Sequence, residues 1–174
     1  NGEADILLGT QMVTKGLDFP DVTLVGVLAA DTALNVDDYR ASEKCFSLIT
    51  QVCGRAGRGD VEGRAIIQTY QPQNRTINLA KEQDYTGFYE NEIVYRQRMQ
   101  YPPFCDFVYI LVSGESDTEA ETEIINIGEI LKENETTNVI KMMGPAPAAI
   151  KKIKNRYRYR IIIKVKQSEL ILPV

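Results

Sequence analysis

The sequence predicts an α/β chain in two parts, a parallel-sheet layer followed by a smaller α+β unit. Two apolar runs, residues 5–10 and 22–31, do not alternate with polar residues, which is typical of strands buried on both faces of a parallel sheet. Residues 155–166 do alternate, which is typical of a strand with one exposed face. We therefore expect two sheets of different kinds.

The first part has the element order of an open α/β layer. A loop with Gly16 and Pro20 separates the two apolar runs. Residues 64–70 predict the next strand, and a second helix is predicted from about residue 78 to 100. Between the strands, residues 41–53 predict a helix whose apolar residues are Cys45, Phe46, Ile49, Val52 and Cys53. The second helix carries apolar residues that we expect to pack against the layer: Tyr85, Phe88, Tyr89, Ile93 and Met99.

Two consecutive prolines, Pro102 and Pro103, predict the end of the second helix, because proline cannot continue one. We place the domain boundary here, between residues 1–100 and 101–174.

The second part has the predicted order β-α-β-β. Residues 104–114 predict a strand, and Ser116 with Glu119 predicts a capping box that begins a helix. Residues 138–150 predict a strand that runs into a proline-rich turn before the strand at 155–166. This order fits a ferredoxin-like βαββαβ sandwich that lacks its last helix and strand. The helix is expected to place Ala120, Ile124, Ile127 and Leu131 on one face.

Composition favours an intracellular, cytoplasmic protein. The chain begins at Asn1 with no signal peptide, and no apolar run approaches the roughly 18 residues of a membrane span. Its three cysteines form no CxxC pair and it has no histidine, so we expect no zinc site within it.

The charge is distributed unevenly. Of 20 basic and 24 acidic residues, eight and one lie in residues 151–174, which leaves 12 and 23 in residues 1–150. A basic end on an acidic body predicts a localised site for a polyanion.

Two glycine-containing segments stand out. The first contains Thr10, Gln11, Gly16 and Asp18, and the second reads Gln51-x-x-Gly54-Arg55-x-Gly57-Arg58. Either segment alone is typical of a structural loop, and cations at a helix C-terminus stabilise its dipole by about 0.3–1 kcal/mol each. The chain has neither a GxxxxGK[ST] phosphate loop nor a DExx magnesium motif.

Together the two segments resemble motifs V and VI of superfamily 2 helicases, and most closely those of the bacterial primosomal replication-restart helicases. The similarity continues through YPPF at 101–104 and GPAPAAIKKIKNRYRYR at 144–160, and so covers nearly the whole chain. One departure is Leu17, where the family usually has a histidine or a similar polar residue. The resemblance implies that the first part is the latter half of a RecA-like lobe 2 and that the chain is a C-terminal fragment.

The resemblance also implies roles for these residues at an ATP site shared with another lobe. Arg55 and Arg58 would contact the phosphates, with Arg58 as the arginine finger, and Gln51 would contact the γ-phosphate or the attacking water. The remaining roles are nucleotide contact for Gly16, Asp18, Gly54 and Gly57, and contact with the DNA backbone for Thr10 and Gln11. The intact parent would bind ATP with Mg²⁺, and zinc through cysteines that this chain does not contain.

The second candidate site is the basic strand. If it is extended, Arg156, Arg158 and Arg160 share one face and Tyr157 and Tyr159 the other. Arginines can contact phosphates and tyrosines can stack on bases, but tyrosines packed inward beneath solubilising arginines fit the residues equally well. The resemblance favours contact with DNA and adds single-strand-binding protein as a partner.

The expected function is a piece of an ATP-dependent 3′-to-5′ DNA helicase that restarts replication at forks and helps to assemble the primosome. On its own the chain is expected neither to hydrolyse ATP nor to unwind DNA. Two alternatives stay open, another superfamily 2 fork translocase and a non-enzymatic module that binds single-stranded DNA or a protein.

Overall fold

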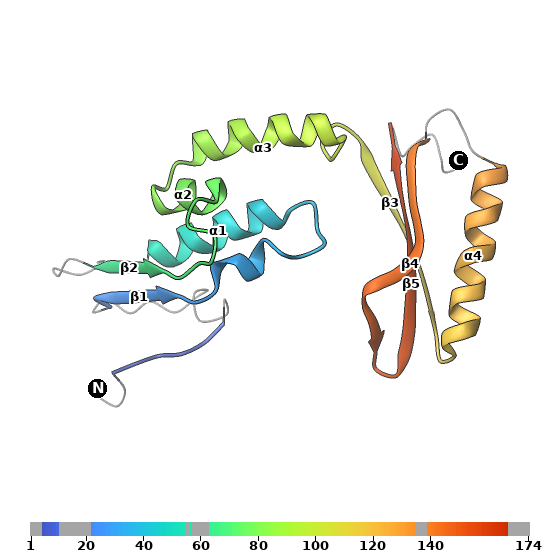
Figure 1. Ribbon diagram of the computed structural model, residues 1–174, viewed down its shortest axis with the longest axis horizontal. Helices are drawn as coiled ribbons and strands as arrows, with labels where there is room; N and C mark the ends of the chain where they lie inside the picture. Colours follow the sequence, from blue (N-terminus) through green and yellow to red (C-terminus); the bar gives the residue numbers. More distant parts are fainter. Residues whose placement is uncertain (1–4, 11–21, 55, 57–62, 135–138, 167–174) are drawn as a thin grey trace. The chain divides into compact units, whose positions relative to one another are not determined.

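The computed structural model describes residues 5–10, 22–54, 56, 63–134 and 139–166. The chain divides into two compact units, Asn1–Ile93 and Val94–Val174, and Figure 1 labels their elements.

The first unit contains the predicted parallel pair of strands. Strands β1 (Leu24–Val27) and β2 (Arg64–Ile67) pair in parallel, with Leu24 opposite Arg64 and Val27 opposite Ile67. Helix α1 (Ala41–Cys53) lies between them in the chain, and a short 3₁₀ helix, η1 (Ala30–Ala33), follows β1. The predicted β-α-β order is therefore confirmed.

The core of this unit forms around α1. Cys45 and Ile49 have no exposed surface, and the Phe46 ring stacks on Phe88 with 4.3 Å between centroids. Helix α2 (Arg75–Lys81) adds Ile77 and is capped by Asn74, whose side chain accepts hydrogen bonds from the first turn. Because such a cap satisfies backbone N–H groups that lack helical partners, it fixes where the helix begins.

Asp31 joins the ends of the two strands. Its carboxylate, buried in η1, accepts hydrogen bonds from the Thr69 hydroxyl at 2.5 Å and the Tyr70 amide at 2.8 Å. The Thr69 bond is the main reason that the pKa of Asp31 lies below its ordinary value. The Asp31 side chain thus links the segment after β1 to the segment after β2, just beyond the last backbone pair of the sheet.

Two predictions for this unit are wrong. Residues 5–10 form no strand, and Ile6 and Leu8 are 87% and 83% exposed. A strand needs a hydrogen-bonding neighbour, and no segment among the described residues pairs with this one. The long second helix is in fact two helices, α2 and α3 (Tyr85–Met99), separated by three residues.

The apolar stripe predicted for α3 is also largely wrong. Only Phe88 is buried, whereas Tyr85 and Tyr89 are 65% and 52% exposed and Met99 is 44% exposed. Tyrosine tolerates exposure because its hydroxyl is hydrated. The spacing of these residues therefore did not define a buried face.

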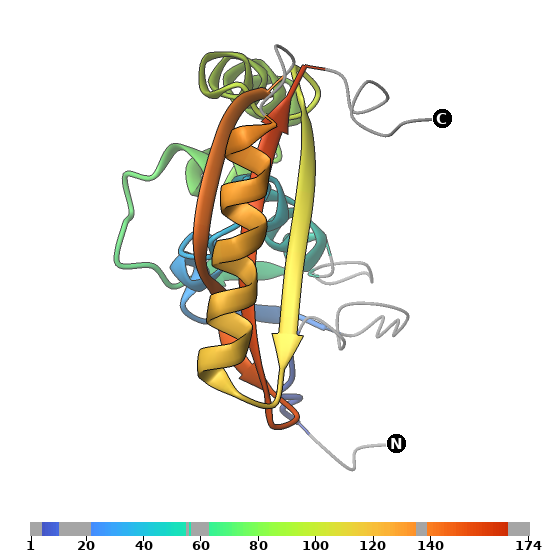
Figure 2. The ribbon, with the colours of Figure 1, turned by 90° about the vertical axis from the view of Figure 1, so that its right-hand side faces the viewer.

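The second unit is an antiparallel sheet covered by one helix. Strands β3 (Asp106–Gly114), β4 (Val139–Ile153) and β5 (Arg156–Val165) lie in the order β3-β5-β4. Helix α4 (Asp117–Glu133) lies along one face of the sheet, as Figure 2 shows. The predicted β-α-β-β order and the end of α3 before the two prolines are confirmed.

Helix α4 begins and packs as its sequence predicts. The Ser116 hydroxyl accepts a hydrogen bond from the Glu119 amide at 3.4 Å, which is the serine half of the capping box. Ala120 and Ile124 are buried against Ile161 and Ile163 of β5, and Ile127 and Leu131 pack partly buried beside them.

The proline-rich turn predicted in residues 138–150 is wrong, because β4 runs through it as a strand. Its pairing with β5 shifts between Met143 and Ala146 and again after Pro147, and Gly144 adopts a φ of 103°. Prolines are tolerated at bulges and in edge strands, and β4 is an edge strand of this sheet. The turn comes later, at Lys154 and Asn155, both with positive φ, as a two-residue hairpin requires.

No described helix has both the length and the apolar character needed to cross a membrane.

Candidate nucleic-acid interface

The basic strand is extended, as predicted, and its side chains alternate between two faces of the sheet. In β5, Tyr157 and Tyr159 face α4 together with Ile161 and Ile163. The arginines take the other face, where Arg158 is paired with Ser113 and Arg160 with Leu111. Three cationic positions therefore lie on the sheet face opposite the helix.

Tyr159 is a buried member of the core, 2% exposed. Its hydroxyl donates a 2.6 Å hydrogen bond to Asp117 in the first turn of α4. Lys151 donates to the other oxygen of the same carboxylate at 2.8 Å, and its ammonium group lies 5.4 Å from the Tyr159 ring. The Lys151 bond lowers the pKa of Asp117, and the Asp117 bond raises the pKa of Tyr159. This network joins β4, β5 and α4.

Tyr157 is half-buried and partly covered by a lysine. The Lys152 ammonium group lies 4.3 Å from its ring centroid and donates to its hydroxyl at 3.1 Å. In this structure neither tyrosine of β5 has a fully open ring, because one is buried and the other carries a cation.

The arginines differ in how they are held. Arg156 donates to the carbonyl and hydroxyl oxygens of Ser113 at 2.7 and 3.2 Å, and its guanidinium lies 3.7 Å from Glu115. Arg158 and Arg160 are half-buried, which lets their stems pack on the sheet.

Lys164 belongs to the basic segment but is not part of a polyanion surface. It is 6% exposed, and its ammonium group donates to the Met99 carbonyl at 2.9 Å and lies 4.2 Å from the Tyr101 ring. Burial lowers its pKa. Lys164 therefore holds the end of α3 to the sheet, a role that alternation alone could not predict.

The motif residues of the first unit are only partly described. Thr10 is exposed in an irregular segment. Gln51 is half-buried in the last turn of α1, and the Gly54 amide ends that helix by donating to the Thr50 carbonyl at 3.0 Å. The other predicted positions lie outside the described residues: Gln11, Gly16, Asp18, Arg55, Gly57 and Arg58.

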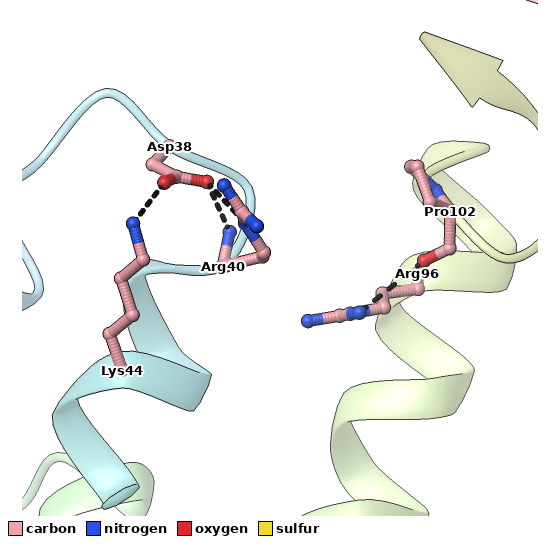
Figure 3. A network of polar contacts seen from close by, with 5 residues as sticks. All are labelled: Asp38, Arg40, Lys44, Arg96 and Pro102. Atoms are coloured by element: carbon pink, nitrogen blue, oxygen red, sulfur yellow. Dashed lines mark hydrogen bonds and ion pairs between the residues drawn. The ribbon is translucent and has the colours of Figure 1, made fainter. Parts of the chain in front are cut away.

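A second cluster of charges lies at the start of α1. Figure 3 shows Asp38 between Lys44 and Arg40. Partial burial raises the pKa of Asp38, but hydrogen bonds from Lys44 and from Arg40 outweigh it and bring the pKa to about 2. The same figure shows Arg96 donating to the Pro102 carbonyl at 3.4 Å, after α3. These cations are held by local partners.

The cysteine thiols and the acidic groups of the described residues are the groups from which a reactive thiol or a metal site would be built. Burial, with a smaller contribution from the Asp31 charge, raises the pKa of the Cys45 thiol to about 11, which disfavours the reactive thiolate. No three His, Cys, Asp or Glu side chains converge within the ranges that the structure describes.

Fold and charge together define a mixed α/β chain: a small parallel sheet with helices, then a three-stranded antiparallel sheet with one helix and a basic central strand. Comparison of the sequence with known proteins identifies a more specific class of protein. Residues 97–173 match the family described as the Primosomal protein N C-terminal domain. The chain is homologous to the C-terminal region of the replication restart protein PriA.

Individual relatives match almost the whole chain. It is 49% identical over 167 residues to the replication restart protein PriA of Bacillus subtilis (strain 168), which covers 96% of the chain and 21% of the relative. It is 44% identical over 174 residues to PriA of Synechocystis and 41% identical over 174 residues to PriA of Chlamydia pneumoniae, covering 99% of the chain and 21% and 23% of those relatives. The chain thus spans about a fifth of the length of the relatives that it matches.

Proposed function

We propose that this chain is part of a bacterial ATP-dependent 3′-to-5′ DNA helicase that acts in replication restart and primosome assembly. The observation that carries the proposal is the 49% identity to a replication restart protein across 96% of the chain. The intact protein would act in the cytoplasm on chromosomal DNA, with single-strand-binding protein and other primosome components as partners.

The two parts have separate roles in this proposal. Residues 1–100 supply the latter half of a RecA-like lobe 2, which is consistent with a parallel strand pair joined through α1. Residues 101–174 supply a DNA- and partner-binding domain. The strand order β3-β5-β4, in which β3 and β4 run parallel on either side of β5, supports the proposal of a ferredoxin-like fold for this domain.

The nucleotide site would lie at the end of α1. Gln51 and Gly54 occupy the last turn and the C-cap of this helix. We propose that Arg55 and Arg58 contact the phosphates of ATP, with Arg58 as the finger, and that Gly16, Asp18 and Gly57 approach the nucleotide. Bound ATP with Mg²⁺ would supply the transferred phosphoryl group, and the guanidiniums would stabilise its charge. Zinc would be held elsewhere in the parent.

The test of the nucleotide site uses the intact parent protein. Arg58→Lys keeps the charge but loses the planar fork, so DNA-stimulated ATP hydrolysis should fall on the order of 10³-fold. Arg75→Lys, an exposed arginine at the start of α2, is the matched control and should hydrolyse ATP normally. Equal activity of the Arg58→Lys and Arg75→Lys proteins would contradict the finger assignment.

The DNA interface would use Arg156, Arg158 and Arg160 on the open face, with Thr10 and Gln11 on the DNA backbone in the first part. Tyr157 and Tyr159 would act by holding β5 against α4 and the lysines, since their rings are covered. Such a strand would contact phosphates and read no sequence.

Replacing the three arginines by alanine should weaken DNA binding and flatten its salt dependence. Each lost phosphate contact should reduce the slope of log K against log salt by about 0.7–0.9. The matched control removes three cations elsewhere: Arg75, Lys81 and Arg98. Fluorescence anisotropy from 50 to 200 mM salt measures the DNA affinity of both variants. Equal affinities of the β5 variant and the control would contradict the interface.

A second candidate function is a non-enzymatic module that binds single-stranded DNA or a protein. The observation that favours it is that the second unit has its own hydrophobic core, closed by α4. The two functions are distinguished by whether DNA affinity depends on ATP. A module would bind DNA with the same affinity whether or not the intact protein hydrolyses ATP.

A further inference from the structure

The face of the three-stranded sheet opposite α4 carries an exposed aromatic side chain next to the arginines. Tyr109 of β3 is 50% exposed and Leu111 is 40% exposed. Both belong to the face that the arginines occupy, because Tyr109 is paired with Ile162 and Leu111 with Arg160 in an unbroken register. Directly paired residues of an antiparallel sheet point to the same side.

Tyr109 lies within reach of Arg160. The two are diagonal neighbours across β3 and β5, and such positions lie about 7–8 Å apart, a distance that long side chains can span. Arg158 follows at the next same-face position of β5. One end of the face is occupied, because Lys164 and Phe107 contact the Tyr101 ring there. Tyr109 is the next position of β3 on this face after Phe107.

The charges of this unit differ between its two sides. On the open face, the charged residues placed by the register within the described strands are all basic: Lys141, Arg156, Arg158 and Arg160, with Lys164 buried at one end. Helix α4, on the other side, carries six acidic residues and one lysine: Asp117, Glu119, Glu121, Glu123, Glu129, Glu133 and Lys132. Lys151 and Lys152 also lie on the helix side, where Lys151 pairs with Asp117 and Lys152 covers Tyr157. A polyanion is therefore attracted to the open face and repelled by the remaining carboxylates of α4.

We propose that this open face binds single-stranded nucleic acid, with an unpaired base stacked on Tyr109 and the phosphates that follow it along the strand on Arg160 and then Arg158. This inference rests on the proposed DNA contact of β5 and adds the kind of strand bound and the stacking residue. A duplex presents no unpaired base to an exposed ring, whereas a single strand offers a base to stack beside every phosphate. A half-exposed tyrosine with one half-buried arginine as its diagonal neighbour, and a second at the next same-face position, matches that combination.

The experiment compares Tyr109→Ala with the wild-type chain in binding a fluorescent 15-nucleotide deoxythymidine strand and a 15-base-pair duplex. Loss of one stacked base should weaken the single strand about 5- to 150-fold. Duplex binding and the salt slope should stay unchanged, since no charge is lost. Tyr109→Phe keeps the ring and should bind like the wild type. Tyr70→Ala removes a tyrosine that is 87% exposed in the first unit, and serves as the matched control.

An abasic strand provides a second measurement on the unaltered protein. If a base stacks on Tyr109, the wild-type chain should bind the abasic strand as weakly as Tyr109→Ala binds the normal one. Circular dichroism melts of each variant check that the fold is intact.

The outcomes separate this inference from the function on which it rests. If Tyr109→Ala binds like Tyr70→Ala while the triple arginine variant loses binding, the stacking role is overturned and the basic interface stands. If the wild-type chain binds neither strand nor duplex at 50 mM salt, both fail. Tyr109-dependent binding of a polyglutamate peptide in place of the strand would overturn the inference in favour of an acidic protein partner.

Discussion

At the scale of single residues, the ion pairs at the start of α1 make the stability of the fold depend on the charge of one carboxylate, Asp38. Lys44 contacts one oxygen of Asp38, and the side chain of Arg40 and its backbone amide contact the other. The carboxylate keeps its charge to a lower pH in the folded chain than in the unfolded one, because these bonds favour the ionised form.

The first prediction is that Asp38→Asn lowers stability near neutral pH but not in strong acid. The folded pKa of about 2 lies below the ordinary value of 3.8, so the carboxylate contributes stability above pH 3.8. That contribution is lost as the pH falls towards 2. Thermal midpoints of the two proteins should differ at pH 6 and converge near pH 2. The exposed Glu90→Gln variant is the control, and a gap for Asp38→Asn that persists at pH 2 would contradict the prediction.

Gly144 is a residue whose backbone requires glycine. Its φ of 103° lies in a region that side chains rarely adopt, and an added Cβ would lie 2.7 Å from the Arg160 carbonyl oxygen.

The second prediction is therefore that Gly144→Ala destabilises the second unit by about 1–3 kcal/mol, from backbone strain together with the contact. The control is Gly26→Ala in β1, where an added Cβ meets nothing within 4 Å. Urea unfolding followed by circular dichroism measures both variants. Equal midpoints for the two would show that the β4 bulge does not depend on glycine.

At the scale of secondary-structure elements, α4 lies close to the sheet at Gly128. A Cβ at this position would lie 3.0 Å from Pro145 of β4 and 3.4 Å from Ile161 of β5. The small residue lets the helix lie against the bulged part of β4, so the bulge and the glycine form one contact between two elements.

The third prediction is that Gly128→Leu destabilises the chain by about 1–3 kcal/mol, even though leucine is a better helix former than glycine. The control is Thr122→Leu on the exposed side of α4, which should change stability by less than about 0.5 kcal/mol. A Gly128→Leu protein as stable as the wild type would mean that α4 can move away from the sheet at little cost.

At the scale of the whole molecule, the chain contains the arginines proposed for ATP but no phosphate-binding loop of its own. The fourth prediction is that the purified chain shows no ATP hydrolysis above background, with or without DNA, whereas the intact parent hydrolyses ATP. Arginines that stabilise the transition state cannot hold Mg²⁺–ATP in place by themselves. A phosphate-release assay at saturating ATP measures this, and turnover by the chain alone would contradict the prediction.

The elements of this chain were largely predictable because they depend on local patterns. The apolar spacing of residues 41–53 predicted α1, Ser116 predicted the start of α4, and the alternation after Asn155 predicted β5. The predictions failed where the outcome depended on a neighbour. Residues 5–10 have strand composition but no pairing partner among the described residues. The prolines near Gly144 lie in a bulged strand and not in a turn, because the segments before and after them pair with β5.

The sequence by itself determined that a basic, alternating strand would carry arginines on one face and tyrosines on the other, because strand periodicity is fixed by the backbone. Only the tertiary structure decided which face was open. Helix α4 covers the face that carries the tyrosines, and Asp117 accepts the hydrogen bond of the Tyr159 hydroxyl. Tyr109 of β3 lies on the same face as the arginines because of the cross-strand register. Lys164, basic in sequence, is buried beneath Tyr101. Burial and register arise from segments far apart in the chain, which a local pattern does not contain.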